Sequence, residues 1–159
     1  MDENDVRLLP PAERLEKCIS ILKNEKDESM RWDAVWLAGE ITETLEPNDP
    51  MVNQIADLFV WVLENDDNGV VKHEAAFQIA ARNMRHKIKD LVHAGLHNKS
   101  ELTRHESIEA LGLMRAFESE PAIMEAMKDP DHNVRETALF VLKRLQRLKN
   151  SKHKFVPKI

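Results

Sequence analysis

The sequence lacks most of the features that would cross-link a chain or carry it into a membrane. Its one cysteine, Cys18, allows no intrachain disulfide and no cysteine cluster for zinc. The start, MDENDV, is acidic and polar, unlike a secretory leader, and the longest apolar run, Leu58 to Leu63, is far shorter than a membrane-spanning helix. We therefore expect a soluble protein of the reducing cytoplasm.

Glycine and aromatic residues are also scarce, with 4 Gly and no Tyr. A hydrophobic fraction of 42% and a charged fraction of 32% suit an all-helical globular protein better than a sheet or a disordered chain. The length of 159 residues fits one domain. No glycine-rich phosphate loop, Ser-His-Asp arrangement or reactive-cysteine context occurs, so ATP-dependent and covalent mechanisms have no support.

Negative charge dominates the chain except at its end. The formal net charge is −5, but residues 143–159 contain seven Lys or Arg and no Asp or Glu, which leaves about −12 on the remainder. Phosphate contacts require clustered cations, so an acidic body argues against a nucleic-acid binder and favours a basic protein partner. We interpret the basic end as a solvated helix terminus and tail, not as a membrane or nucleic-acid patch.

Turn-forming residues divide the chain into helices. Apolar residues recur at helical spacing between six breaks, which lie at Pro10-Pro11, Pro47 to Pro50, Asp66 to Gly69, Asn98 to Ser100, Glu118-Ser119 and Asp129 to Asp131. The resulting eight helices pair as hairpins over about 10–46, 48–85, 86–117 and 118–149. We expect an N-terminal tail over 1–9, a repeat domain over 10–149 and a basic C-terminal tail over 150–159.

The second helix of each hairpin carries a repeated block, which reads MRWDAV, VKHEAA, TRHESI and VRETAL along the chain. Its basic residue recurs after 41, 32 and 31 positions. Such self-similarity is typical of solenoids, in which each hairpin buries its apolar face by stacking on its neighbours. The predicted fold is an all-α, right-handed α-solenoid of about four HEAT-like hairpins.

Two of the blocks place a His-Glu pair at the same phase, His73-Glu74 and His105-Glu106. At about 100° per residue, His73 and Glu74 fall roughly 200° and 300° from Val71, whereas the apolar positions of that helix fall between about 40° and 140°. Both pairs are therefore predicted to point away from the core.

The paired imidazoles and carboxylates predict a metal site. One His-Glu pair on a solvated helix is ordinary, but two at one phase of adjacent repeats are harder to attribute to chance, and helices packed about 10 Å apart would bring them together. Without thiolate, these ligands suit non-haem iron, and also zinc, nickel or manganese, with positions left open for oxygen or water. His93 and His97 lie four residues apart without an evident third ligand, so we interpret them as surface histidines.

These segments resemble deoxyhypusine hydroxylase, a HEAT-repeat family with a non-haem diiron centre. The resemblance rests on VVKHEAAFQIA, on LTRHESIEALG about 32 positions later and on DPDHNVRETA, and it spans about residues 28–148. It implies that His73, His105 and Glu106 bind iron, that Glu74 faces the substrate amine, and that dioxygen is used to hydroxylate deoxyhypusine in a translation factor. At the corresponding positions of the first block, we expect Trp32 and Asp33 to line the substrate pocket.

The chain departs from that family in length, because the family has two four-hairpin halves with four His-Glu motifs and this chain has one half with two. A homodimer would restore four motifs and two irons, one per chain, with the last helix, Leu139 to Leu148, as the contact. The leading hypothesis is an iron-dependent monooxygenase acting on an amine-bearing protein side chain. The alternative is a non-catalytic HEAT adaptor, similar to the short HEAT modules of scaffold and bilin lyase-like proteins, that binds a partner on its acidic concave face.

Overall fold

The protein is a row of helical hairpins in a computed structural model that describes residues 1–153. The described residues form no strand. Their α-helices are α1 (Glu3–Arg7), α2 (Pro11–Asn24), α3 (Glu28–Ile41), α4 (Pro50–Asn65), α5 (Gly69–Ala81), α6 (Ile88–His97), α7 (Glu101–Leu113), α8 (Glu120–Ala126) and α9 (His132–Leu148). Short 3-10 helices follow or join them at η1 (Thr42–Thr44), η2 (Arg85–Lys87) and η3 (Phe117–Ser119).

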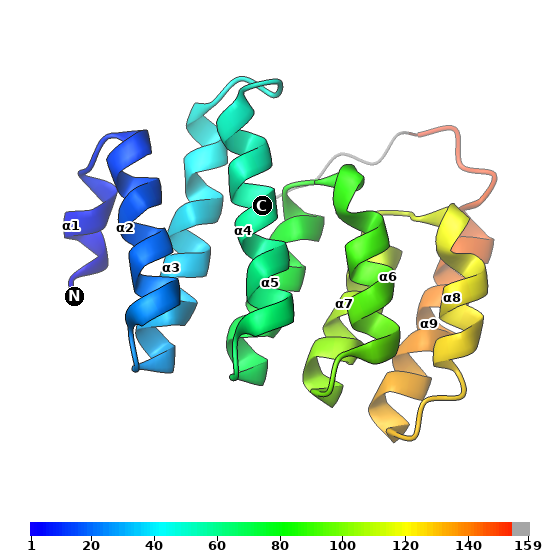
Figure 1. Cartoon of the computed structure of the whole chain (residues 1–159). Coiled ribbons are helices and arrows are strands. Elements are labelled where there is room, and N and C mark those ends of the chain that lie inside the picture. The colour runs from blue at the N-terminus through cyan, green and yellow to red at the C-terminus, as the bar shows by residue number, and fades with distance from the viewer. Residues whose placement is uncertain (154–159) are drawn as a thin grey trace.

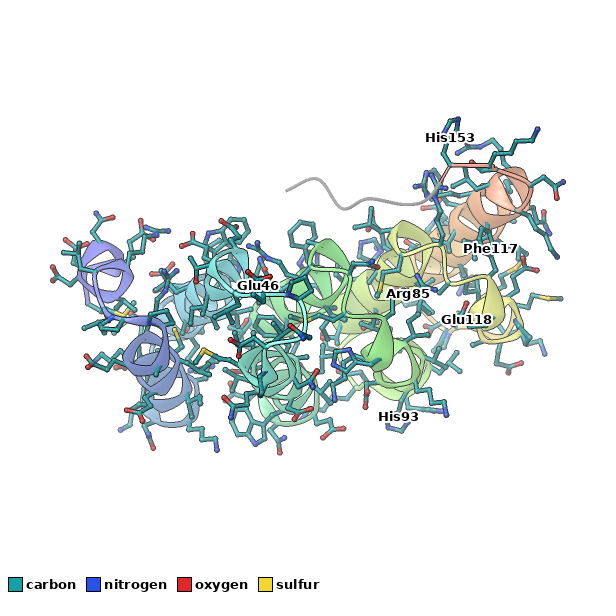
Figure 2. All side chains as sticks on the ribbon, turned by 90° about the horizontal axis from the view of Figure 1, so that it is seen from above. Glu46, Arg85, His93, Phe117, Glu118 and His153 are labelled. Carbon is teal, nitrogen blue, oxygen red and sulfur yellow. The ribbon has the colours of Figure 1, made fainter. Side chains whose placement is uncertain are left out.

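The helices pair in chain order and stack in two rows (Figure 1). Seen from above, α2, α4, α6 and α8 form one row, and α3, α5, α7 and α9 form the other (Figure 2). The predicted all-α solenoid of hairpins is thereby confirmed. Residues 1–9, which the sequence separates as a tail, contain α1, whose Val6 is buried against the first hairpin. Residues 154–159 of the predicted basic tail lie outside the described residues.

Side-chain caps explain where most of the longer helices begin. Asp27, Asp49, Asn68, Ser100 and Asp131 each precede a helix and accept a hydrogen bond from a backbone N–H of its first turn. These acceptors satisfy donors that have no partner inside the helix. Pro50, just after Asp49, adds a residue whose fixed φ suits a first helical turn. The turn residues of the sequence therefore set the hairpin boundaries.

Two glycines allow neighbouring helices to approach closely. A Cβ added at Gly95 of α6 would lie 2.7 Å from Cδ1 of Ile108 on α7. One added at Gly112 of α7 would lie 2.9 Å from both γ-methyls of Val141 on α9. Real Cβ atoms do not tolerate such distances, so a larger residue would push the helices apart. Gly95 thus allows close packing of α6 on α7 within the third hairpin, and Gly112 allows close packing of α7 on α9 in the row that contains the predicted site.

The basic residue of the repeated block links each hairpin to the next, and we call this series, Arg31, Lys72 and Arg104, the cation ladder. Arg31 donates to both carboxylate oxygens of Asp66, at 2.9 and 3.2 Å, and Arg104 does the same to Asp129, at 2.8 and 3.0 Å. Both arginines also bond backbone carbonyls of the loop before their own helix. The loops that join the two helices of each hairpin all lie at one edge of the solenoid, so the ladder runs along that edge (Figure 1).

The middle rung of the ladder is weaker. Lys72 is 2% exposed, and its ammonium donates one hydrogen bond, at 3.1 Å, to the neutral amide oxygen of Asn98. Burial lowers the pKa of Lys72, because desolvation disfavours the charged amine, and the positive charge of Lys99 acts in the same direction. The second and third hairpins are therefore joined at this edge without an ion pair.

The last hairpin differs in part from the expected contact surface. Leu139 and Phe140 are 41% and 63% exposed, as the dimer hypothesis requires, but Leu145 is fully buried. Leu145 lies on the face of α9 that packs into the shared core, so it cannot contribute to an outer surface.

No helix within residues 1–153 is both long and apolar enough to cross a bilayer.

Candidate metal centre

The three predicted ligands converge where α5 packs beside α7. His73 comes from α5, and His105 and Glu106 come from α7. One ligand atom of each lies within 4.8 Å of the other two. The imidazole rings stack with centroids 6.4 Å apart and planes 20° apart. We call these three residues the His-Glu cluster.

Glu106 and His73 make the shortest contact in the cluster. Oε2 of Glu106 lies 2.8 Å from Nε2 of His73 and 4.0 Å from Nε2 of His105. The hydrogen bond with Glu106 raises the pKa of His73, although burial acts in the opposite direction. This contact joins two of the three predicted ligand atoms, so a cation bound by them would replace the proton that His73 and Glu106 share.

The ring of His105 is held by a hydrogen bond at Nδ1, the nitrogen that faces away from Glu106. Its Nδ1 lies 2.6 Å from the hydroxyl of Thr137 on α9, while Nε2 faces Glu106 and lies 3.3 Å from Oε2 of Glu109. If Nδ1 donates to the hydroxyl, Nε2 carries the free lone pair that a metal ligand requires. Thr137 thus orients His105 toward the cluster.

The burial of the two glutamates corrects one expectation. Glu74 and Glu106 are only 7% and 6% exposed, whereas the two histidines are half-buried. The prediction that both members of each pair point away from the core is therefore wrong for the glutamates. The angle argument considers one helix alone, but the glutamate side of each second helix faces its neighbour in the row.

Glu74 lies apart from the three convergent ligands. Its Oε1 accepts a hydrogen bond from Nε2 of Gln78 at 3.0 Å. Burial raises the pKa of Glu74, because a carboxylate loses hydration there, while the hydrogen bond from Gln78 partly offsets this effect. Charge from His73 and Glu106 also influences Glu74, so it belongs to the surroundings of the cluster.

Trp32 and Asp33 lie in a separate hollow. They line a pocket of about 330 Å³ between the beginnings of α3 and α5, together with Asn68 and Val70. Trp32 stacks on Trp36 with centroids 6.4 Å apart, and burial raises the pKa of Asp33. Among the described residues, neither Trp32 nor Asp33 forms a hydrogen bond or an ion pair with the His-Glu cluster.

The sequence analysis missed two residues that contact the cluster. Glu109 could have been found from its position four residues after His105, which places both on one face of α7. Thr137 occupies the glutamate position of the fourth block, so its contact with His105 repeats that of Glu106 with His73. The histidine of one repeat therefore meets the glutamate position of the next.

The donor set fits a divalent metal. Ligands of one ion bound at about 2.0–2.2 Å lie no further apart than about 4.4 Å, so the three residues need only a small side-chain adjustment to bind together. Two imidazoles and one carboxylate leave coordination positions free, and this combination is typical of non-haem iron oxygenases. The half-buried histidines leave these positions accessible from solvent.

Comparison with known proteins agrees with this architecture. A family model described as HEAT repeats matches residues 56–143, which is more than half of the chain. The matched region extends from α4 into α9 and includes the whole His-Glu cluster. No curated protein matches the chain. By its stacked hairpins and this match, the chain belongs to the HEAT-repeat family.

Proposed function

We propose that this protein is an iron-dependent hydroxylase that acts on an amine-bearing side chain of a protein substrate. The observation that carries the proposal is the convergence of His73, His105 and Glu106 from two adjacent repeats. Iron bound by such a set would supply the activation of dioxygen. The resemblance to deoxyhypusine hydroxylase supports a hypusine-type translation factor as the substrate.

The residues around the cluster have distinct roles in this proposal. His73, His105 and Glu106 hold the metal, and Thr137 fixes the ring of His105 through Nδ1. Glu74 is the acceptor for the substrate amine, because a buried carboxylate with a raised pKa is stabilised in its charged form by an arriving cation. Asp33 and Trp32 line a hollow near the first repeat that would receive a more distant part of the substrate.

The two glutamates provide a direct test of these roles. Glu106→Gln is expected to lower iron affinity by at least about tenfold, because it removes the only anion among the three ligands. Glu74→Gln should keep the iron content of the parent protein and weaken capture of an amine-bearing peptide. Iron analysis of both variants, each purified without metal affinity tags, measures the first effect. Equal iron loss in both variants would contradict the assignment.

We further propose that the working unit is a two-fold homodimer with one iron per chain and two per dimer. Three protein ligands on an open surface leave the metal exposed to water, whereas a second copy would cover it. Met124 of α8, Leu139 and Phe140 are 56%, 41% and 63% exposed, and no further hairpin of the described chain packs on them. This patch is the proposed contact with the second copy.

Light scattering tests the assembly. The iron-loaded protein is expected at about twice the chain mass of 18.4 kDa, and Phe140→Asp should halve that mass because it places a charge in an apolar contact. Leu8→Asp, at an 84% exposed position just after α1 and outside the patch, is the matched control and should remain dimeric. A monomer that binds one iron tightly and consumes dioxygen would refute the dimer but not the ligand assignment.

The alternative function is a non-catalytic adaptor that binds a basic partner through its acidic surface. The net charge of −5 and the HEAT repeats favour this possibility. An adaptor should purify without stoichiometric iron, and substitution of His73 or His105 should leave partner binding unchanged. Elemental analysis of the purified protein therefore separates the two functions.

A further inference from the structure

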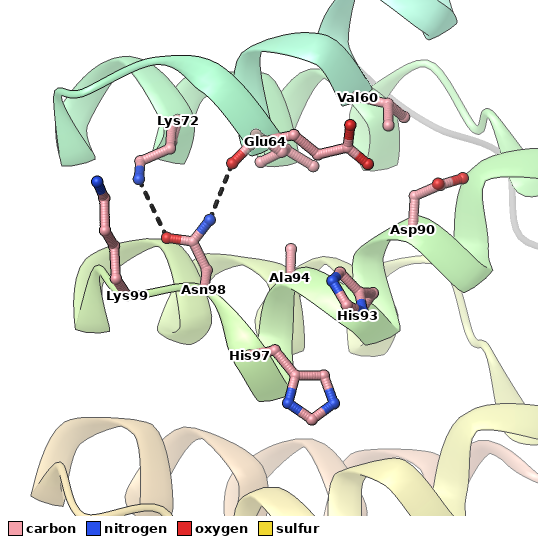
Figure 3. Close-up of a pocket in the computed structure, with 10 residues that line it drawn as sticks. Val60, Glu64, Lys72, Asp90, His93, Ala94, His97, Asn98 and Lys99 are labelled. Atoms are coloured by element: carbon pink, nitrogen blue, oxygen red, sulfur yellow. Dashed lines mark hydrogen bonds between the residues drawn. The ribbon is translucent and has the colours of Figure 1, made fainter.

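A second pocket lies between the first helices of the second and third hairpins, apart from the His-Glu cluster. It has a volume of about 420 Å³, within the range of small-molecule sites, and is formed by α4, α6, the loop before α7 and Lys72 of α5 (Figure 3). Lys72 and Lys99 lie at one end, beside Asn98. The carboxylates of Glu64 and Asp90 lie toward the other end.

The cationic end lacks the counter-charge found at the corresponding place one repeat earlier. There, Arg31 donates hydrogen bonds to Asp66 and to Asp67, each through a contact of 2.9 Å. At the pocket, the equivalent loop positions carry Asn98 and Lys99 in place of the two aspartates. Lys72 is therefore surrounded by a neutral amide and a second cation, whereas Arg31 is surrounded by two carboxylates.

Hydrogen bonding at Lys72 is also incomplete. An ammonium has three N–H donors, and among the described residues that of Lys72 makes one hydrogen bond, to Oδ1 of Asn98. Asn98 cannot compensate, because its Oδ1 also accepts from the backbone N–H of Ser100 and its Nδ2 donates to the carbonyl of Leu63 (Figure 3). Lys72 is otherwise enclosed, so two donors remain for a molecule in the pocket.

We propose that this pocket binds a small zwitterionic molecule, with a carboxylate held by Lys72 and Lys99 and an amine held near Glu64 and Asp90. The ligand carboxylate takes the place of the aspartates that the preceding repeat contains. The separation of positive and negative ends selects an amino acid whose two charged groups are spaced by several carbons. This site is independent of the proposed metal chemistry.

Titration of metal-free protein with 4-aminobutanoate, 6-aminohexanoate and hexanoate, followed by amide NMR shifts, tests the proposal. We expect shifts at Asn98, Lys99 and His93 with the amino acids, weaker binding of hexanoate because it lacks the amine, and loss of affinity as salt screens the charges. Inorganic phosphate is the comparison for a simple anion site. Absence of binding by either amino acid up to about 10 mM would overturn the proposal.

A loop exchange provides the sharpest variant. The double substitution Asn98→Asp with Lys99→Asp introduces the two aspartates of the preceding repeat. It should weaken amino-acid binding about tenfold or more, because a carboxylate of the protein then forms an ion pair with Lys72 in place of the ligand. Lys72→Met should have the same effect, and Lys89→Met, an exposed lysine of α6 outside the pocket, should have none. Unchanged binding by the folded loop variant, or phosphate binding that matches that of the amino acids, would reject the zwitterion site.

Discussion

Replacement of His73 or His105 by alanine is expected to lower iron affinity by at least about 100-fold while the helical structure remains. Each histidine supplies one of three ligand atoms within 4.8 Å of one another, and a two-ligand remnant holds a divalent ion poorly. Both side chains are half-buried at the edge of the core, so their loss opens no large cavity. Iron analysis and circular dichroism measure the two effects.

The matched control is His93→Ala, which removes an exposed histidine of α6 that lies outside the cluster. It should change neither iron content nor helicity. If His73→Ala and His105→Ala both retained full iron, the ligand assignment would be wrong. If either variant unfolded, the histidine would be structural, contrary to its position at the edge of the core.

The same centre should bind iron more weakly in acid. The hydrogen bond to Glu106 raises the pKa of His73, so its imidazole keeps its proton to a higher pH than an ordinary histidine. A metal needs the deprotonated ring, and iron affinity should therefore rise as the pH increases through that pKa and fall below it. An NMR titration of the metal-free protein locates the pKa, and Glu106→Gln should lower it.

Arg31→Ala is expected to lower the free energy of unfolding by about 3–5 kcal/mol. The side chain of Asp66 is 2% exposed, and the substitution leaves this buried carboxylate without the guanidinium that donates to both of its oxygens. Carbonyls of the preceding loop also lose a donor. Urea unfolding followed by circular dichroism measures the change.

Arg135→Ala provides the comparison from the fourth block. Within the described part of the chain, Arg135 hydrogen-bonds the carbonyls of its own loop and forms no ion pair with a carboxylate, so its removal should cost about 1 kcal/mol. Combining Arg31→Ala with Asp66→Asn should recover part of the loss, because no unpaired buried charge remains. Equal destabilisation by Arg31→Ala and Arg135→Ala would show that the ion pair between repeats contributes little.

Much of this architecture could be predicted because it depends on spacing. The caps at Asn68 and Ser100 and the recurrence of the basic residue mark hairpins before any tertiary contact is considered. The convergence of His73 with His105 follows from the same phase on adjacent stacked helices. Periodicity therefore predicts which positions meet across the row.

Periodicity alone could not predict which residues of the two His-Glu pairs converge as metal ligands. Glu74 and Glu106 occupy equivalent positions, yet Glu106 meets His73 while Glu74 bonds Gln78. The partner of each glutamate position comes from the preceding repeat, and for Glu74 that repeat offers the indole of Trp32 in place of an imidazole. The burial of Leu145, in contrast, does follow from spacing, because the buried face of α9 consists of residues at helical intervals, Val134, Ala138, Val141 and Leu145.

The weakest rung of the cation ladder and the proposed metal ligands share one junction. Lys72 and His73 are neighbours on α5, and both reach toward the third hairpin, one to the neutral Asn98 and the other to Glu106. The junction between the second and third hairpins therefore lacks the kind of ion pair that Arg31 and Arg104 form at the two neighbouring junctions. A cation bound by His73 on one side of this junction and by His105 and Glu106 on the other would add a polar link between the second and third hairpins.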